Sequence, residues 1–399
     1  MYANGLLRAL LCSVLFAAVR AAMRSPDAAL QLLDASSYPH AKCLDGTPGG
    51  FYISLDDSNE GDTWVFMLQG GGECVDESSC KARAKTKLGT SSRMDNKTYF
   101  NYGIMNTRAT QNPHFYNANY VKVAYCTGDL HMGTVSSPDS STYGLYFSGA
   151  HIVTAVVDTL LKRYGLGTAA HIVLAGQSAG GLGIVSLLDR VALQIKTSGS
   201  KAAIVGAPEG GYYFLNDHTY HGPNPKPSNF IPWGTNHFPI YYKLWHAEVN
   251  EKCAEHYSDS PWRCLVADYS FPFIETPIFI TEALTDRVVI PLHNGIPSKS
   301  PPFTGDEVPF VKGWGKTMRS ALQQVLRSPT AGVFAPACWT HTTFDTGILL
   351  NGTDRLTYLA NWMYNGQAAK AIDPCGDYLC NKHCPTFPHR AGREKRAVL

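Results

Sequence analysis

Short apolar segments alternate along the chain with longer segments whose apolar residues recur at helical spacing. The short segments predict strands at residues 64–68, 120–125, 171–175, 202–205 and 277–281. The longer segments predict helices at residues 149–164, 179–195 and 311–326. This alternation is typical of a mostly parallel central sheet flanked by helices, so we expect an α/β fold.

Residues 211–240 have little periodicity and are rich in aromatic residues, asparagine and proline. We expect long loops or short helices there, over the carboxyl edge of the sheet, where loops usually shape a substrate pocket. Neither a linker rich in proline and serine nor an internal repeat divides the middle of the chain. The pattern therefore favours a single domain.

The amino end has a positive Arg8, an apolar stretch at residues 9–19 and then small residues. This stretch is too short for a stable transmembrane helix, so we expect residues 1–22 to be a cleaved secretory signal, with an uncleaved anchor as the alternative. The domain then covers residues 23–385, and the basic residues 386–399 form a solvated tail.

The composition, with 44% hydrophobic and 17% charged residues among 399, suits a globular protein with a large core. A formal net charge of +2 is too small to indicate a nucleic-acid-binding protein. No later segment is apolar for long enough to cross a membrane. We expect a secreted monomer, with N-linked glycans at the sequons of Asn96 and Asn351.

One cysteine falls in the expected signal, and ten remain in the mature chain. An even number in an oxidising compartment predicts disulfides, and two close pairs could each close a short loop. A zinc site with His383 is the alternative for the last three cysteines, but these lack a C-x-x-C pair. The ten are Cys43, Cys74, Cys80, Cys126, Cys253, Cys264, Cys338, Cys375, Cys380 and Cys384.

A G-x-S-x-G pentapeptide at residues 176–180 follows the predicted strand 171–175 and opens the predicted helix 179–195. This order of strand, tight turn and helix is the context of a nucleophile elbow, in which small residues let strand and helix close around a strained serine. The alternative is a glycine-rich loop with a capping serine. The motif predicts Ser178 as a nucleophile and an α/β-hydrolase-like sheet around it.

A serine nucleophile needs a histidine base and a carboxylate that orients the base, and in α/β-hydrolases these follow in the order Asp, His. Asp286 comes shortly after the strand at 277–281 and would lie in a loop on the same side of the sheet as the elbow. The alternative for Asp286 is a turn carboxylate in a surface ion pair. Glu282 and Asp268 are weaker candidates for the orienting carboxylate.

His341 fits the place of the base, because it lies late in the chain, after the last predicted helix. The nearby Cys338 could tether its loop and so position the ring. Chain order leaves His293, His383 and His389 as rivals.

The anionic intermediate of ester cleavage needs preorganised backbone N–H donors, one of them from the residue after the nucleophile, here Ala179. A second donor should come from a glycine-rich loop after an early strand, and Gly70, Gly71 and Gly72 follow the strand at 64–68. A phosphate-binding loop is the alternative, but the usual glycine patterns of such loops are missing.

Four motifs together resemble the pectin acetylesterase family, which also contains Notum-like deacylases. They lie at residues 68–74 (LQGGGEC), 112–117 (NPHFYN), 176–181 (GQSAGG) and 336–341 (PACWTH). The resemblance covers nearly the whole mature chain. It implies a secreted carboxylesterase that needs neither a metal nor a cofactor.

The resemblance also implies roles for individual residues. The catalytic serine, aspartate and histidine of the family fall on Ser178, Asp286 and His341. The implied oxyanion donors are Gly71, Gly72 and Ala179. The implied disulfides are Cys43–Cys126, Cys74–Cys80, Cys253–Cys264, Cys338–Cys384 and Cys375–Cys380.

Three positions depart from the family pattern. Gln69 stands where family members have an acidic residue, Glu73 stands where an aromatic residue follows the glycines, and Glu209 stands where they have an aspartate. The first two changes alter the charge beside the oxyanion loop, and the third lengthens a supporting carboxylate by one carbon. We expect these changes to affect substrate choice rather than catalysis.

The leading hypothesis is a serine esterase that removes acyl groups, mainly acetyl, from an extracellular polysaccharide such as pectin in a cell wall. A second hypothesis keeps the mechanism but assigns a lipidated protein as substrate, as in Notum-like deacylases. A fatty chain needs a deep apolar pocket, whereas acetyl needs only a shallow one. A third hypothesis is a secreted binding protein that has lost catalysis, against which the presence of all three catalytic residue types argues.

Overall fold

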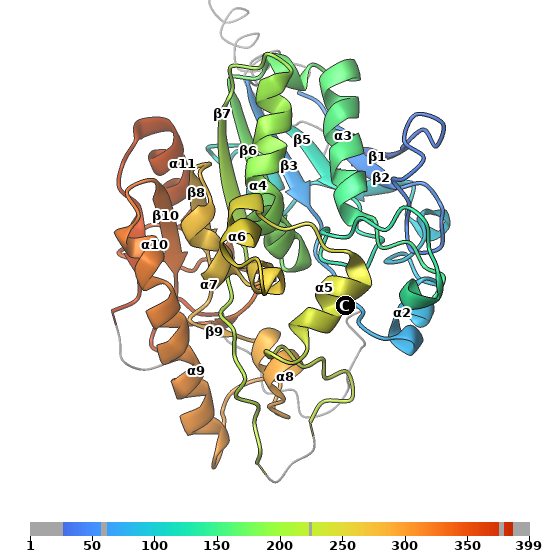
Figure 1. The fold of residues 1–399 in the computed structure, drawn as a ribbon. Coiled ribbons are helices and arrows are strands. Elements are labelled where there is room, and N and C mark those ends of the chain that lie inside the picture. The colour runs from blue at the N-terminus through green and yellow to red at the C-terminus, as the bar shows by residue number, and fades with distance from the viewer. Residues whose placement is uncertain (1–26, 57–61, 223–225, 375–378, 386–399) are drawn as a thin grey trace, which may run out of the picture.

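The computed structural model describes residues 27–56, 62–222, 226–374 and 379–385. The expected signal and the basic tail lie outside the described residues. A ten-stranded sheet runs through the molecule, with helices on both of its faces (Figure 1). Across the sheet, the strands are β12 (Lys370–Ile372), β10 (Ala331–Ala335), β8 (Ile278–Thr281), β7 (Ala203–Glu209), β6 (His171–Gln177), β3 (Thr63–Leu68), β5 (Asn119–Val123), β2 (Gly50–Ser54), β1 (Asp27–Leu32) and β4 (Lys97–Tyr99).

Neighbouring strands from β12 to β5 are parallel, and β2, β1 and β4 add an antiparallel edge. The predicted α/β fold with a mostly parallel sheet is therefore confirmed. A separate two-stranded ladder joins β9 (Thr285–Asp286) to β11 (Trp339–Thr340).

The α-helices of the described residues are α2 (Glu77–Arg83), α3 (Gly149–Arg163), α4 (Ala179–Thr197), α5 (Phe238–Trp245), α6 (Glu251–His256), α7 (Ala267–Ser270), α8 (Val289–Asn294), α9 (Glu307–Ala321), α10 (Gln323–Arg327) and α11 (Arg355–Asn365). Short 3₁₀ helices lie at Ser91–Arg93, Gly103–Met105, Ser140–Thr142, Leu166–Thr168, Pro261–Leu265 and Phe271–Phe273.

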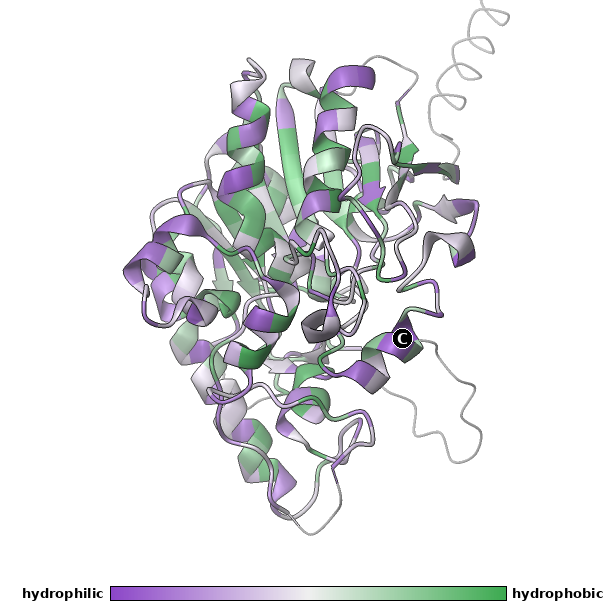
Figure 2. Cartoon of the chain, turned by 45° about the vertical axis from the view of Figure 1, so that its right-hand side comes forward, coloured by the Kyte–Doolittle hydropathy of each residue, from purple (hydrophilic) through white to green (hydrophobic). Residues whose placement is uncertain are grey.

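Both faces of the central strands are buried, as an apolar parallel strand between two helical layers requires. On β3, Phe66 and Leu68 enter the core shared with α3 and α4, whereas Val65 and Met67 enter the opposite core, which α11 covers. Figure 2 shows this arrangement as apolar central strands inside helices whose outer positions are polar. No helix within the described ranges combines the length and the apolar character needed to span a bilayer.

Among the predicted elements, the helix at 311–326 differs most from the observed structure. It forms two helices, α9 and α10, which are separated at Leu322. The first begins earlier than predicted, because Pro309 lies in its first turn, where a missing N–H costs no helical hydrogen bond.

Four disulfides link distant and neighbouring segments, and they are four of the five pairs implied by the family resemblance. Cys380 is also disulfide-bonded, and Cys375, its implied partner, lies outside the described residues. Within the described part of the chain, no three His, Cys, Asp or Glu residues gather as a metal site. The four pairs are Cys43–Cys126, Cys74–Cys80, Cys253–Cys264 and Cys338–Cys384.

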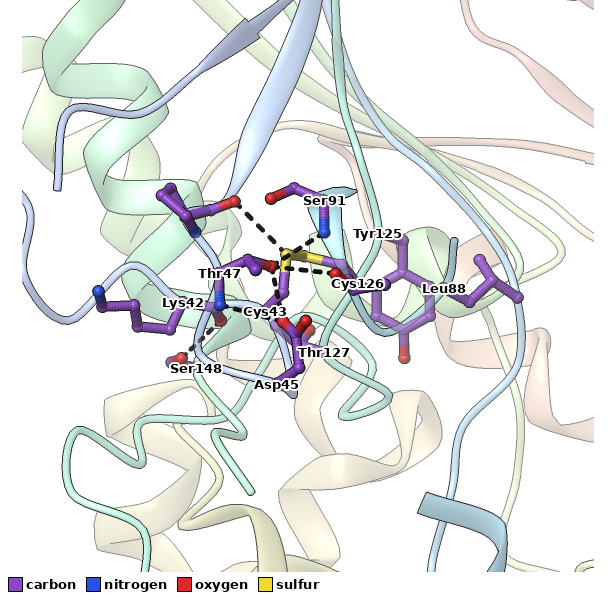
Figure 3. Close-up of a disulfide and its surroundings, with 12 residues drawn as sticks. Lys42, Cys43, Asp45, Thr47, Leu88, Ser91, Tyr125, Cys126, Thr127 and Ser148 are labelled. Atoms are coloured by element: carbon purple, nitrogen blue, oxygen red, sulfur yellow. Dashed lines mark hydrogen bonds between the residues drawn. A yellow bond between two sulfur atoms is a disulfide. The ribbon is translucent and has the colours of Figure 1, made fainter. Parts of the chain in front are cut away.

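The Cys43–Cys126 bond ties the amino-terminal loop to the end of β5 (Figure 3). Beside it, the N–H of Leu44 donates to the carbonyl oxygen of Cys126 at 2.9 Å. Tyr125, next in the chain, lies near Leu88 in the same view. The covalent link therefore holds Tyr125, which packs against the glycine loop described below.

Candidate active site

Ser178 occupies a strained turn between β6 and α4, at the carboxyl edge of the sheet. Its φ of 55° and ψ of −121° are unusual for a residue with a side chain and cost about 1–3 kcal/mol. A Cβ on Gly176 would lie 2.1 Å from the oxygen of Gly180, and one on Gly180 would lie 2.0 Å from the oxygen of Leu68. Only glycine allows this close approach, so the pentapeptide forms the predicted elbow and presents Ser178 at its tip.

Asp286 and His341 meet through the small β9–β11 ladder. In its register Asp286 lies opposite Thr340, which places the next residue, His341, beside the carboxylate. The two side chains are joined by a hydrogen bond of 2.6 Å between Nδ1 of His341 and Oδ2 of Asp286. Asp286 thus lies in a short strand rather than in the predicted loop, and it is buried rather than at the surface.

The charge on Asp286 is stabilised despite burial. Burial alone would raise its pKa, but the His341 ring and the backbone N–H groups of Val289 and Val288 outweigh it, so the pKa is lowered. An ionised Asp286 accepts the Nδ1–H of His341, which leaves Nε2 as the basic nitrogen. That Nε2 is buried and has no hydrogen-bond partner among the described residues. His341 and Ser178 line the same cavity, so Nε2 is available to a reacting group there.

Tyr213 adds a contact that the sequence pattern did not indicate. Its hydroxyl lies 2.7 Å from the oxygen of Gly210 and 3.2 Å from Oδ2 of Asp286. Burial raises the pKa of Tyr213 well above its ordinary value, so the phenol remains a neutral donor. It supports the carboxylate on the side away from the two backbone donors.

The glycine loop reaches the cavity with its backbone. Gly71 and Gly72 have φ values of 153° and 63°, which favour glycine, and both line the cavity with Ser178 and Ala179. Ala179 is the first residue of α4, so its N–H has no partner inside the helix. Arg83 holds the loop from behind by donating from Nη2 to the oxygens of Gly71 at 2.6 Å and Gly72 at 3.3 Å.

The cavity has a volume of about 660 Å³, within the range of small-molecule sites. One part of its lining is polar and includes Gln69, Tyr102 and Lys122. The other part is apolar and comes from the loop before α5 and from α8; it comprises Phe230, Ile231, Trp233, Val288, Val289 and Leu292.

Glu73 interrupts the apolar part. Its carboxyl accepts a hydrogen bond of 2.9 Å from Nε1 of Trp233, and burial raises its pKa to about 7. The Trp233 ring stacks on His293 with 3.6 Å between ring centroids. Burial lowers the pKa of His293 to about 3, so this ring is neutral at physiological pH.

Glu209 lies behind the elbow. Its backbone oxygen accepts the N–H of Ser178 at 2.9 Å, and its carboxylate accepts from Gln177 at 3.0 Å and faces Arg355 at 3.7 Å. Burial raises its pKa to about 7, although the positive charge of Arg355 opposes this shift. Glu209 therefore supports the position of the elbow through both its backbone and its side chain.

The other candidates from the sequence occupy different places. Glu282 is buried near Asp286 and accepts the N–H groups of Tyr212 and Ala283, both at 3.0 Å, so it does not reach His341 by a hydrogen bond. Asp268 accepts from Gln324 at 2.7 Å. Of the rival histidines, His293 lines the cavity, His383 is exposed and His389 lies outside the described residues; Asn96 and Asn351 are exposed.

Comparison with known proteins matches residues 21–385 to the pectinacetylesterase family. Palmitoleoyl-protein carboxylesterase notum1a of Danio rerio is 28% identical over 383 residues, covering 90% of this chain and 73% of the relative. Pectin acetylesterase 11 of Arabidopsis thaliana is 27% identical over 370 residues, covering 86% and 89%. Among solved structures, the Wnt deacylase Notum from Drosophila superimposes with a TM-score of 0.78 at 26% identity, covering 91% of this chain and 100% of that one.

Proposed function

The chain belongs to the pectinacetylesterase family, and from this premise we propose that it is a secreted serine carboxylesterase that removes O-acyl groups from an extracellular polysaccharide. The observation that carries the mechanism is the 2.6 Å bond between Asp286 and His341, which occupies Nδ1 and leaves Nε2 as the basic nitrogen of a ring that lines the same cavity as Ser178. Ser178 attacks the acyl carbonyl while His341 takes its proton. His341 then protonates the leaving hydroxyl, and water releases the acyl group from the enzyme.

The oxyanion of each tetrahedral intermediate would be bound by the N–H groups of Gly71, Gly72 and Ala179. Support for these donors is the loop conformation that Arg83 maintains through the carbonyl oxygens of Gly71 and Gly72. Ionised Asp286 holds the imidazolium that forms during the reaction.

An acidic polysaccharide such as pectin suits the polar part of the cavity. Lys122 lines it, and its ammonium lies over the rings of Tyr52 and Tyr102, at 5.7 and 6.0 Å from their centroids. A uronate carboxylate on the leaving sugar would complement this charge. The apolar part of the same cavity favours the second candidate, a deacylase of lipidated protein, because a fatty chain needs such a surface.

The experiment that tests the mechanism replaces Ser178 with alanine and measures hydrolysis of p-nitrophenyl acetate and labelling by a fluorophosphonate probe. We expect both to disappear in Ser178→Ala and to persist in Ser92→Ala, which changes an exposed serine. Unchanged turnover in Ser178→Ala would exclude the proposed nucleophile. Absence of labelling in the wild type would favour the secreted binding protein.

The substrate is tested with acetylated pectin and acetylated xylan, which differ in the carboxylates of the polymer. We expect faster acetate release from pectin and a loss of this preference in Lys122→Met. An equal rate on the two polymers in the wild type would exclude recognition of an acidic leaving group. Secretion with removal of residues 1–22 and glycosylation at Asn96 and Asn351 form part of the same proposal.

A further inference from the structure

Glu73 is an acidic residue of the cavity lining, and its carboxyl lies against Trp233 of the apolar part. It directly follows Gly72 of the glycine loop, and its side chain is only 2% exposed. Ile231, Trp233 and Leu292 line the cavity with it. Glu73 therefore lies just beneath the surface along which an acyl chain would extend beyond the oxyanion donors.

Glu73 has little compensation for a negative charge. Nδ1 of His293 donates to the oxygen of Ile231 at 2.8 Å and lies 3.8 Å from Glu73, so the ring does not bind the carboxyl. Among the described residues, neither lysine nor arginine lies within ion-pair distance of it. The charge of Arg83 lowers the pKa of Glu73 somewhat, but that guanidinium already binds the carbonyl oxygens of Gly71 and Gly72.

We propose that Glu73 determines acyl-chain selectivity by admitting acetyl and other short acyl groups and by rejecting long alkyl chains; this inference rests on the esterase function proposed above. An acetyl group adds one methyl beyond the bound carbonyl. An octanoyl chain must extend along the apolar wall and replace the cavity water beside the buried carboxyl, which lowers the dielectric constant around that group without supplying a partner. The cavity would then have the volume to hold a fatty chain, but binding of that chain would be unfavourable.

Ionisation strengthens the rejection, because losing the nearby cavity water costs a buried anion far more than a buried neutral acid. Burial raises the pKa of Glu73 to about 7, so its charge changes across the neutral range. The tyrosines that face it have raised pKa values and stay neutral there, and His293 is also neutral. The ionisable groups around Glu73 are Arg83 on α2, Tyr125, Tyr213, Tyr241 on α5 and His293 on α8.

The test measures kcat/KM for p-nitrophenyl octanoate and for p-nitrophenyl acetate at pH 6 and pH 8. The quantity compared is the octanoate value divided by the acetate value. Because the neutral fraction of an acid with a pKa near 7 falls about tenfold over this interval, the wild-type ratio should fall about tenfold. In Glu73→Gln, which has the same shape and cannot ionise, the ratio should not change with pH. In Glu73→Leu it should rise at least about tenfold above the wild type at pH 8.

Any pH dependence of the shared catalytic step cancels in the ratio, since both esters are cleaved by the same residues. Glu77→Gln, an exposed change on α2, is the matched control and should behave as the wild type. If Glu73→Leu does not fold, the comparison of Glu73→Gln with the wild type still tests the proposal. A ratio that is the same in Glu73→Gln and wild type at both pH values would overturn the proposal. Failure of the esterase function itself would appear differently, as wild-type protein that cleaves neither ester.

Discussion

Replacing Asp286 with asparagine tests whether the Asp286–His341 contact sets the tautomer of the base. In the wild type, Oδ1 of Asp286 accepts the N–H groups of Val288 and Val289 at 2.7 and 2.8 Å, and Oδ2 accepts Nδ1–H of His341. An asparagine has one acceptor oxygen, and the two backbone donors would take it. Its NH₂ group would then face His341.

An amide donor at that position can be satisfied only if Nδ1 of His341 gives up its proton. The proton would move to Nε2, the nitrogen that accepts the proton of Ser178 in the proposed mechanism. The wrong tautomer of a triad histidine lowers kcat roughly 10⁴-fold, which corresponds to about 5 kcal/mol of transition-state stabilisation. The fold should survive, because both backbone donors keep an acceptor.

The assay is steady-state hydrolysis of p-nitrophenyl acetate at pH 7.5, with circular dichroism to verify folding. We expect kcat to fall by about 10³–10⁴ and KM to change little, because the lost interaction acts in the transition state. Asp268→Asn is the matched control, since that carboxylate binds Gln324 and should leave kcat within twofold, roughly the scatter expected of a change remote from the reacting atoms. A folded Asp286→Asn enzyme that retained a tenth of wild-type kcat would refute the role assigned to Asp286.

Two further predictions concern stability and the glycine loop. The pKa of Glu73 rises from 4.5 to about 7 on folding, so its contribution to stability is complete below pH 4.5 and is lost as the pH rises through 7. The free energy of unfolding of Glu73→Gln, measured by chemical denaturation and taken relative to the wild type, should therefore increase by about 3 kcal/mol from pH 4.5 to pH 8. A difference between the two proteins that does not change with pH would contradict this. Arg83→Met should lower kcat for p-nitrophenyl acetate roughly 10²-fold with little change in KM, because the oxyanion donors lose their support. Arg93→Met, at an exposed arginine, is its control, and equal kcat values in the two variants would contradict this role.

The elbow was predictable from sequence because its cause is local. The steric demand at Gly176 and Gly180 is set by residues within one turn of the chain and by the strand beside it, so it leaves a compact motif. Chain order then narrowed the choice of carboxylate and base to a few residues. The central strands were predictable for a related reason, since burial on both faces produces continuous apolar segments.

Other features leave no such local trace. β1, β2 and β4 are partly exposed, so their apolar residues do not form the continuous segments that mark the central strands. The contacts of Tyr213 with Asp286 and of Arg83 with the glycine loop depend on tertiary packing. An isolated tyrosine or arginine in a non-periodic segment carries no signal of such a partner.

The three residues that depart from the family pattern have different contacts and different places relative to the cavity. Glu209 faces Arg355 and binds Gln177, so its charge is partly compensated, and its backbone oxygen serves the elbow. The amide oxygen of Gln69 lies 3.4 Å from the backbone nitrogen of Tyr125, which links it to the polar part of the cavity. Glu73 alone of the three combines burial, a place in the apolar lining and the absence of a nearby ion-pair partner among the described residues. Replacing the cavity water beside such a group with an acyl chain is unfavourable, because the chain offers the group no polar partner. We therefore expect acyl-chain preference to depend on Glu73 rather than on Gln69, in the polar part of the cavity, or on Glu209, which is not among the residues that line it.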